Sequence, residues 1–313
     1  MRLERNQQRK RKLRLKKKWK AVLFLLLVLF LGTVVYSYFQ YKQGVLVSGD
    51  KAKNEKEKYQ FNGKRDQFGG TNILLIGSDA RENENSRADT IMIVHYHPDH
   101  KTFKLLSIMR DSYVEIPGHG TNKINAAFAF GGPELLRQTI KDNFNLELQY
   151  YTIVDFQGFV HVIDEAFPDG VKIDVEKRMD EYINVALDPG VQRLDGESLL
   201  GYVRFRHDAI GDFGRVQRQQ KVVKELAKQF TSVGTIPKLP KLIGVVTPFV
   251  NTNLSTTNMI SIGTDYMTKK ETIQTMRIPV DGAYEDERIS GIGAILSLDF
   301  EKNNQEIYDF LKE

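Results

Sequence analysis

The stretch RFRHDAIGDFGRVQRQQ, Arg204–Gln220, holds the residues best suited to bind an anion. From Asp212 the pattern becomes helical, so Arg215 and Gln219, four residues apart, share one face near the helix N-terminus. Free backbone N–H groups and the positive end of the helix dipole lie there too. A planar guanidinium can hold two phosphate oxygens and keeps its charge when partly desolvated, which predicts a diphosphate site. The four arginines predicted to contribute are Arg204, Arg206, Arg215 and Arg218. A surface helix start with ion pairs to Asp208 and Asp212 is the alternative.

Three further pairs of charged residues follow apolar segments or flank the loops between them. They are Asp79 with Arg81, Arg87 with Asp89, and Arg110 with Asp111. Asp79 and Asp89 stand at the two ends of one loop, so their carboxylates can approach each other as ligands for a hard cation. Two carboxylates would repel a diphosphate by roughly 4 kcal/mol per unit-charge pair at about 4 Å. A Mg²⁺ ion between them, or Mn²⁺, turns this repulsion into attraction. Each pair by itself is more typical of a helix cap or a surface ion pair.

Alternating strands and helices must position these side chains. The predicted strands are Asn72–Ile76, Thr90–Tyr96, Phe103–Met109, Tyr113–Ile116, Tyr150–Val154, Val171–Val175 and Thr272–Ile278. The predicted helices cover about 133–143, 156–167 with Asp155 as N-cap, 194–203, 212–230, 242–250, a segment from Ser255, and 304–311. This alternation predicts an α/β fold with a mixed central sheet flanked by helices on both faces, an α-β-α sandwich. The loop after Ile76 then lies at the carboxyl end of a strand, where such sheets place ligands.

The N-terminal region predicts a membrane anchor. Residues 21–39, AVLFLLLVLFLGTVVYSYF, are uncharged over about the length that crosses a bilayer as a helix. Residues 1–20 are strongly basic, which places the N-terminus in the cytoplasm and the body outside by the positive-inside rule. The predicted organisation is a basic cytoplasmic tail (1–20), a single-pass signal-anchor helix (21–39), a flexible polar linker (40–70) and an extracytoplasmic domain (71–313). A cleaved signal peptide is the alternative.

Charge and cysteine content narrow the function classes. The first 20 residues carry a net charge of +10, and the total of +5 minus these +10 leaves −5 for the rest of the 313-residue chain. Affinity for an anionic substrate must therefore come from a local arginine cluster. The sequence contains no cysteine, which excludes disulfides, thiolate metal sites and thiol nucleophiles. The basic tail has no helix-turn-helix pattern, so no direct nucleic-acid partner is expected.

Five groups of residues occur in a fixed order behind the anchor. They are GSDAR (77–81), SRADT (86–90), SIMRD (107–111), KINA (123–126) with GGP (131–133), and RFRH (204–207) with GDFGRVQRQ (211–219). Together they resemble the LytR–CpsA–Psr family over about 72–230, with weaker similarity beyond. Ala88 stands where many members have a hydroxyl residue, a mild departure because Arg87 and Asp89 remain.

The resemblance implies an enzyme of Gram-positive cell-wall assembly. Such an enzyme moves a glycopolymer, for example wall teichoic acid or capsular polysaccharide, from a polyprenyl-diphosphate carrier to peptidoglycan. By the same implication Asp79 and Asp89 hold Mg²⁺. The residues that would bind the diphosphate are Arg87, Arg110, Arg204, Arg206, Arg215 and Gln219.

The mechanism expected from this resemblance is attack of a muramic-acid hydroxyl on the sugar-side phosphorus, with polyprenyl phosphate leaving. Arg110 and the other arginines neutralise the developing charge, and positioning supplies most of the rate. Asp111, Asp89 or Asp212 would deprotonate the acceptor, and the sequence leaves this choice open. Three alternatives remain: a membrane-bound attenuator that affects cell-wall gene expression indirectly, a module that holds polyprenyl diphosphates without turnover, and hydrolysis as a side activity.

Overall fold

The structure is a computed structural model of the 313-residue chain, and it describes residues 2–49, 57–78, 87–207, 210–230, 236–269 and 272–312. At its centre is a six-stranded sheet in the order β10-β3-β2-β1-β6-β9. The strands are β1 (Thr71–Ser78), β2 (Ala88–His97), β3 (Thr102–Ile108), β6 (Tyr150–Asp155), β9 (Val250–Thr252) and β10 (Gln274–Ile278). β1, β3, β6 and β10 run in one direction and β2 and β9 in the other. The carboxyl ends of β1 and β3 therefore share an edge with the start of β2.

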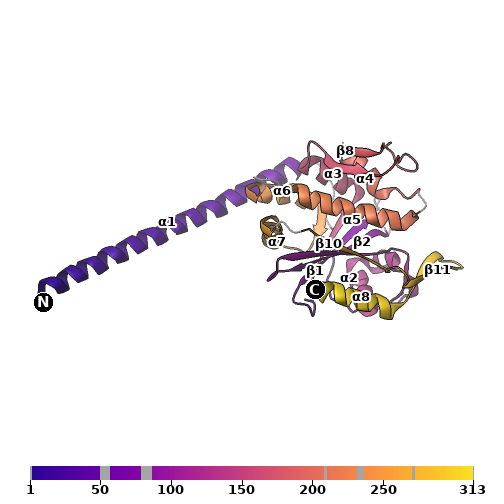
Figure 1. Ribbon diagram of the computed structural model, residues 1–313, viewed down its shortest axis with the longest axis horizontal. Helices are drawn as coiled ribbons and strands as arrows, with labels where there is room; N and C mark the ends of the chain where they lie inside the picture. Colours follow the sequence, from indigo (N-terminus) through magenta and orange to yellow (C-terminus); the bar gives the residue numbers. More distant parts are fainter. Residues whose placement is uncertain are drawn as a thin grey trace.

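Helices cover both faces of this sheet, as Figure 1 shows. On one face lie α2 (Ile124–Phe144) and α8 (Phe300–Lys312), and on the other α3 (Phe156–Ala166), α4 (Gly196–Arg204) and α5 (Gly211–Phe230). The α2 and α8 face holds the main core, in which Leu74 and Ile93 of the sheet pack with Leu136 and Ile140 of α2 and Ile307 of α8. The predicted α/β fold, a mixed sheet between helices, is confirmed.

A second core lies among α3, α4, α5 and a two-stranded sheet of β7 (Val171–Val175) and β8 (Gly190–Leu194). It buries Ile173, Leu199 and Val222. The helix predicted over 194–203 begins two residues later, because Leu194 ends β8 and the Asp195 side chain accepts the N–H of Ser198 as the N-cap. The predicted N-cap Asp155 of α3 is confirmed in the same way.

A third sheet, in the order β11-β12-β4-β5, was not predicted from the sequence apart from β4. Its strands are β4 (Ser112–Ile116), β5 (Gly120–Lys123), β11 (Tyr284–Ile289) and β12 (Gly293–Leu298). β11 reads YEDERI and is largely exposed, so it lacks the apolar alternation that identifies a strand. Its partner β12 decides its conformation.

Three other helices differ from the prediction, one of them α8, which begins at Phe300 and not at 304. The segment predicted as a helix over 242–250 divides into α6 (Leu239–Val246), a 3₁₀ turn η2 (Thr247–Phe249) and the start of β9. A short η1 (Ile236–Lys238) precedes α6, and α7 (Thr256–Lys269) follows β9. The helix predicted over about 133–143 instead continues an earlier helical segment that begins at Ile124. Gly131 and Gly132 break its dihedral angles, and Gly132 has φ +63°, which favours glycine.

The N-terminal helix α1 (Arg2–Gly49) projects from the body (Figure 1). Its segment Val22–Ser48 is long and apolar enough to cross a membrane, with a mean hydropathy of 2.4. The flexible linker predicted over 40–70 is wrong for its described parts. Residues 40–49 continue the helix, and in 57–70 Phe61 and Phe68 pack against the main core while Lys64 N–H donates to Leu148 O at 3.0 Å. Aromatic side chains spaced among the polar residues supply this anchoring.

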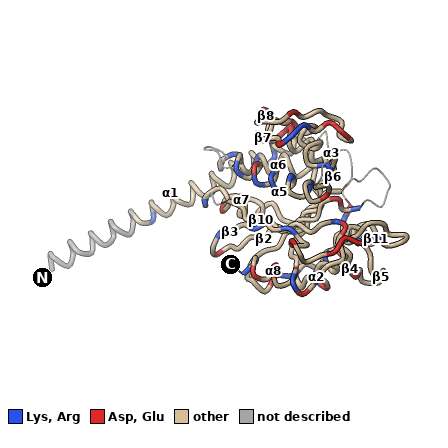
Figure 2. Tube along the Cα trace, turned by 45° about the vertical axis from the view of Figure 1, so that its right-hand side comes forward, with Lys and Arg blue, Asp and Glu red and all other residues tan. Residues whose placement is uncertain are grey.

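Charged residues of both signs are interspersed over the body in Figure 2, with an acidic run along β11. The apolar stretch of α1 carries no charge between Lys20 and Lys42. This distribution agrees with the slightly negative charge of the chain beyond its first 20 residues. Anion binding therefore depends on where a few arginines meet.

The C-terminal end of α1 packs closely against α6 through two glycines, one on each helix. A Cβ on Gly44 would lie 2.1 Å from the carbonyl oxygen of Lys241, and a Cβ on Gly244 would lie 2.2 Å from that of Tyr41. Only glycine allows the two backbones to approach this closely. The anchor helix is therefore joined to the body by direct packing.

We expect Gly44→Leu to separate α1 from α6, because the side chain would overlap backbone atoms that cannot move aside. Hydrogen exchange on the detergent-solubilised full chain should show faster exchange in α6 and around residue 44. Gly32→Leu on the same helix is the control, since a Cβ there meets nothing within 4 Å. Equal exchange in the two variants would contradict the packed junction.

Candidate functional site

Asp89 lies on a β-bulge at the start of β2. Gly77 pairs with Thr90 and Ser78 pairs with Ala88, so Asp89 is the extra residue on its strand. A bulge redirects a side chain at the end of a strand pair, and such bulges are common beside active sites. Gly77 is required opposite it, because a Cβ there would lie 2.9 Å from the Cβ of Thr90. The sequence SRADT thus places one carboxylate at the edge of the sheet where the sequence predicts a ligand site.

Arg110 and Asp111 are fixed in the turn that leaves β3 for the third sheet. Met109 N–H donates to Ile278 O at 2.8 Å, and Leu296 N–H donates to Asp111 O at 2.9 Å. The Met109 side chain is buried with Val216 and Leu296, which orients the preceding strand end against α5. Backbone bonds from two sheets therefore hold the Arg110 side chain at the same edge as Asp89.

Helix α5 brings the remaining polar residues to this edge. Arg215 Nη2 lies 2.9 Å from Asp212 Oδ2, one turn away. Gln219, one turn further on, donates from Nε2 to Thr90 Oγ1 at 2.9 Å and so attaches α5 to β2. Val216, between them in sequence, turns into the small cluster with Met109. Arg215 and Gln219 lie four residues apart on α5, as the helical pattern in the sequence predicted.

These elements form a cluster of alternating charges centred on Arg110. Arg110 Nη1 bonds Asp89 Oδ1, and its Nε lies 3.5 Å from Asp111 Oδ2 and 3.7 Å from Asp212 Oδ2. Arg215 Nη1 is 3.9 Å from Asp89 Oδ1. Lys123 Nζ contacts Asp111 Oδ1 at 2.8 Å. Three carboxylates thus surround Arg110, and Arg215 and Lys123 each pair with one or two of these carboxylates.

The two central arginines have opposite pKa shifts. Burial alone would lower the pKa of Arg110, but the carboxylates of Asp212, Asp89 and Asp111 together raise it. Arg215 is more deeply buried, and burial together with the positive charges of Arg110 and Arg206 lowers its pKa to about 10. Its side chain is 5% exposed. An anion placed beside Arg215 would relieve this unfavourable environment.

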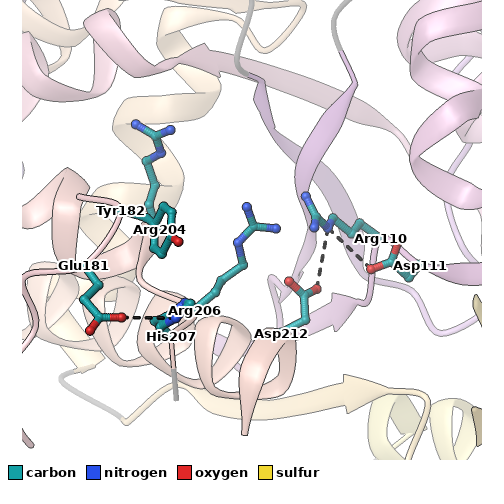
Figure 3. Close-up of a pocket in the computed structure, with 8 residues that line it drawn as sticks. All are labelled: Arg110, Asp111, Glu181, Tyr182, Arg204, Arg206, His207 and Asp212. Atoms are coloured by element: carbon teal, nitrogen blue, oxygen red, sulfur yellow. Dashed lines mark ion pairs between the residues drawn. The ribbon is translucent and has the colours of Figure 1, made fainter. Parts of the chain in front are cut away.

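A pocket of about 450 Å³ opens beside the cluster. Its lining residues are Arg110, Asp111, Glu181, Tyr182, Arg204, Arg206, His207 and Asp212. Figure 3 shows Arg206 extending into the space between Arg204 and Tyr182 on one side and Arg110 and Asp212 on the other. Within the described residues, Arg110 Nε, Asp212 Oδ1 and Arg215 Nε are buried and have no hydrogen-bond partner. Arg110 and Asp212 line the pocket, so a polar ligand there would satisfy their two atoms.

The structure does not bring every predicted site residue to this pocket. Arg218 is turned away, with Nη2 donating to Phe205 O and its guanidinium 5.2 Å from the Phe205 ring centroid. It holds the end of α4 against α5. Arg204 reaches the pocket but rests on the Phe156 ring, 4.5 Å from its centroid. Arg87 is exposed just before β2, and Asp79 lies outside the described residues.

Three pocket residues were missed in the sequence: Glu181, Tyr182 and His207. His207 follows Arg206 directly, so its position within RFRH was an available signal. Glu181 and Tyr182 come from the loop between β7 and β8, which has no motif and reaches the pocket through tertiary packing alone. Lys123, from the motif KINA, was also not assigned a role.

The carboxylates present suit a hard divalent cation. Asp89 is 26% exposed, and Asp212 offers a buried oxygen without a hydrogen-bond partner among the described residues. The described residues contain no group of three His, Cys, Asp or Glu side chains that would hold a metal unaided. Mg²⁺ commonly takes one or two protein carboxylates and completes its shell with substrate phosphate and water. The donor set therefore fits Mg²⁺ bound together with a diphosphate.

Comparisons with known proteins identify the family of the chain. Residues 34–306 match the model of the LytR_cpsA_psr family. The chain is 43% identical to the Staphylococcus aureus (strain COL) protein named Regulatory protein MsrR, over 90% of this chain and 86% of that one. It is 32% identical to a protein of Oceanobacillus iheyensis named Polyisoprenyl-teichoic acid--peptidoglycan teichoic acid transferase TagU, over 100% of this chain and 99% of that one.

A solved structure is similar over the body. The LytR-CPS2A-psr family protein YwtF (TagT), with bound octaprenyl pyrophosphate lipid, superposes with a TM-score of 0.60 at 26% identity. The match covers 83% of this chain and 93% of that one.

Proposed function

Because the chain belongs to the LytR_cpsA_psr family, we propose that it is a membrane-anchored phosphotransferase. In this proposal it attaches an anionic glycopolymer, such as wall teichoic acid or capsular polysaccharide, to peptidoglycan from a polyprenyl-diphosphate carrier. The TagU relative, named as a teichoic acid transferase, and the TagT structure with a polyprenyl pyrophosphate support it. The apolar helix α1 would cross the membrane and hold the body at its extracytoplasmic side, with the basic residues 2–20 in the cytoplasm.

The observation that carries the proposal is that Arg110, Arg204 and Arg206 line a single pocket. Arg215 belongs to the charged cluster beside this pocket, where it contacts Asp212 and Asp89. The body as a whole is slightly acidic, so its overall charge would not attract an anion. The local group of arginines must do so. Arginine forks paired with carboxylates at a strand edge are suited to a substrate that is both anionic and metal-associated. A diphosphate has both properties.

The polyprenyl chain needs an apolar surface next to the arginines. Leu75 and Val94 lie on the face of the central sheet opposite the main core and are only half-buried. Their neighbours Leu74 and Ile93 point into the main core and are fully buried. That face lies toward α3 and α5 (Figure 1). We place the polyprenyl chain between the sheet and these helices. Ile163 of α3 and Leu199 of α4, by contrast, belong to the second core.

The proposed reaction is a phosphoryl transfer. A muramic-acid hydroxyl forms a new O–P bond at the sugar-side phosphorus, the bridging P–O bond breaks, and polyprenyl phosphate leaves with the electron pair. The hydroxyl proton passes to a carboxylate at the pocket, Asp111, Asp212 or Asp89. Asp111 and Asp212 line the pocket directly, which favours these two as the base. Arg110 and Arg206 stabilise the charge on the phosphoryl oxygens.

The test is transfer by the full-length protein in lipid vesicles. The substrates are a polyprenyl diphosphate that carries a radiolabelled sugar polymer and purified peptidoglycan. We expect label to appear in the peptidoglycan through a phosphodiester, with release of one polyprenyl phosphate per attachment. Release of free polymer phosphate alone would indicate hydrolysis, and label that stays on the lipid would overturn the transferase.

We further propose that Asp79 and Asp89 hold Mg²⁺ when the diphosphate is bound. Bound Mg²⁺ would neutralise phosphate oxygens and so support the charge-stabilising role of the arginines. We expect EDTA to lower the transfer rate at least about tenfold and Mg²⁺, or less well Mn²⁺, to restore it.

Asp89→Asn should then raise the half-saturating Mg²⁺ concentration about tenfold, because a neutral amide is a weaker ligand than a carboxylate. Asp286→Asn, on the exposed strand β11, is the matched control. Transfer that is insensitive to EDTA would remove the metal from the proposal.

The regulatory name of the 43% identical relative favours a second candidate function, an attenuator of cell-wall gene expression. With the body outside the membrane, such an effect would follow indirectly from changes in the wall. A deletion strain complemented with Arg110→Ala distinguishes the two. Restored gene expression without restored polymer attachment would favour direct regulation.

A further inference from the structure

The pocket has a second half that a diphosphate does not require. Glu181, Tyr182 and His207 line it opposite Arg110 and Asp212. Figure 3 shows Tyr182 and Glu181 across the pocket from Arg110, with Arg206 between the two halves. The diphosphate half pairs its carboxylates with Arg110, whereas Glu181 would repel phosphate oxygens and the face of the Tyr182 ring offers them no donor. These residues therefore face a different part of the ligand.

The Tyr182 side chain is presented to solvent by a constrained backbone. It is 87% exposed, and its φ of +58° lies in the left-handed region that residues other than glycine seldom adopt. Such a conformation persists only where the surroundings impose it, and it is frequent at ligand-binding positions. An exposed aromatic ring gains nothing from the protein core, so stability does not account for its position.

The loop that carries Tyr182 is closed at its base. Met179 and Leu187 pair through two backbone hydrogen bonds, of 2.9 and 2.8 Å, and both side chains are buried. Arg178 Nη1 adds an ion pair of 2.6 Å to Asp188 Oδ1. The tip is held as well, because Glu181 Oε2 lies 3.1 Å from His207 Nε2. Tyr182 is thus supported from both sides.

The chemistry of the three side chains matches a sugar ring. The Tyr182 ring centroid is 4.8 Å from that of His207, inclined at 41°, which leaves an aromatic corner at the pocket rim. One face of a pyranose consists of C–H groups and packs well on an aromatic ring, whose face carries partial negative charge. The Glu181 carboxylate can accept from sugar hydroxyls, and His207 can donate to them.

We infer that Glu181, Tyr182 and His207 form a pyranose-binding subsite beside the diphosphate, with the Tyr182 ring as its stacking surface. This inference rests on the proposed function for its substrate, since the sugar is the one bonded to the diphosphate or the one that supplies the attacking hydroxyl. Both candidate sugars are hexopyranoses, and the subsite would hold either one within reach of Arg206.

The experiment compares Tyr182→Ala with Tyr182→Phe and Tyr182→Trp in the full-length protein in vesicles. Val191→Ala is the matched control, because Val191 is another exposed apolar residue on β8 and does not line the pocket. We expect Tyr182→Ala to raise one KM about tenfold with kcat changed less than about threefold. Phe and Trp should retain near wild-type KM, because they keep an aromatic face.

The arms of the assay distinguish the two sugars. A raised KM for the lipid-linked donor assigns the subsite to the donor sugar, and a raised KM for peptidoglycan assigns it to the acceptor. Unchanged values for both substrates in Tyr182→Ala overturn the inference. Equal losses in the Ala, Phe and Trp variants also overturn it, because they would show that stacking is not involved.

A binding measurement separates failure of this inference from failure of the proposed function. Titration of wild-type protein with octaprenyl diphosphate, with and without one attached hexose, needs no turnover. If the hexose tightens binding and Tyr182→Ala removes that gain, the subsite stands even where no transfer is seen. If the hexose changes nothing and the peptidoglycan KM of Tyr182→Ala equals that of the wild type, the subsite is wrong even where transfer occurs.

Discussion

Replacing Arg110 with alanine is expected to lower the rate of polymer transfer by about 10³-fold or more. Arg110 is the charge shared by Asp89, Asp111 and Asp212, with Nε or Nη1 within 3.7 Å of each carboxylate. Without it, these carboxylates face the diphosphate directly. Each unit-charge pair at about 4 Å costs roughly 4 kcal/mol at an effective dielectric near 20, and that energy corresponds to about 10³ in rate.

Two further variants show whether the Arg110 guanidinium itself is needed: a conservative substitution of Arg110 and a substitution of an arginine far from the pocket. Arg110→Lys keeps the positive charge but loses the planar fork, so we expect it to remain well below wild type. Arg288→Ala removes an exposed arginine on β11, away from the residues that line the pocket, and should transfer normally. The measurement is label attached to peptidoglycan per minute at saturating donor. Near wild-type transfer by Arg110→Ala would remove Arg110 from the site.

Replacing Arg215 with methionine is expected to reduce transfer by about 10²-fold or more without lowering the stability of the free protein. Burial is the main cause that brings the pKa of Arg215 to about 10, well below its ordinary value. Near neutral pH the group is charged in both folded and unfolded chains. The folded state therefore carries the full cost of this shift, roughly 3 kcal/mol.

Methionine fills similar space and removes that cost. Asp212 and Asp89 keep Arg110 as a partner, at 3.7 Å for Asp212 Oδ2 and by a direct bond for Asp89, so no carboxylate is left isolated. We expect the Tm of Arg215→Met to equal or exceed that of the wild type. Inorganic pyrophosphate with Mg²⁺ should raise the Tm of the wild type, because the bound anion stabilises the buried charge of Arg215. The Tm of the variant should stay nearly unchanged, because this charge is absent.

Thermal unfolding and transfer assays on the same preparations check this combination. A clear fall in Tm would show that Arg215 is mainly structural, with Asp212 dependent on it. Normal transfer would show that the buried arginine is not used. A stable but inactive variant is the pattern of a site in which local strain serves binding.

The sequence alone determined the parts of this protein that depend on local pattern. The alternation of apolar segments predicted the α/β fold and most strands of the central sheet. The side-chain cap Asp155 and the helical spacing from Asp212 to Gln219 follow from residue types and positions a few residues apart. The motif order also identified the family, because motifs are short and independent of the fold that joins them.

Tertiary structure decided what depends on distant partners. The exposed strand β11 exists because β12 pairs with it, and residues 57–70 pack on the body because Phe61 and Phe68 meet a core built elsewhere. Arg215 and Arg218 differ little in sequence context, yet one faces Asp89 and the other faces Phe205. Tyr182 reaches the pocket only through the packing of the β7–β8 loop. Local pattern fixes which residues are helical, whereas the neighbours that surround a helix decide which of its side chains meet a ligand.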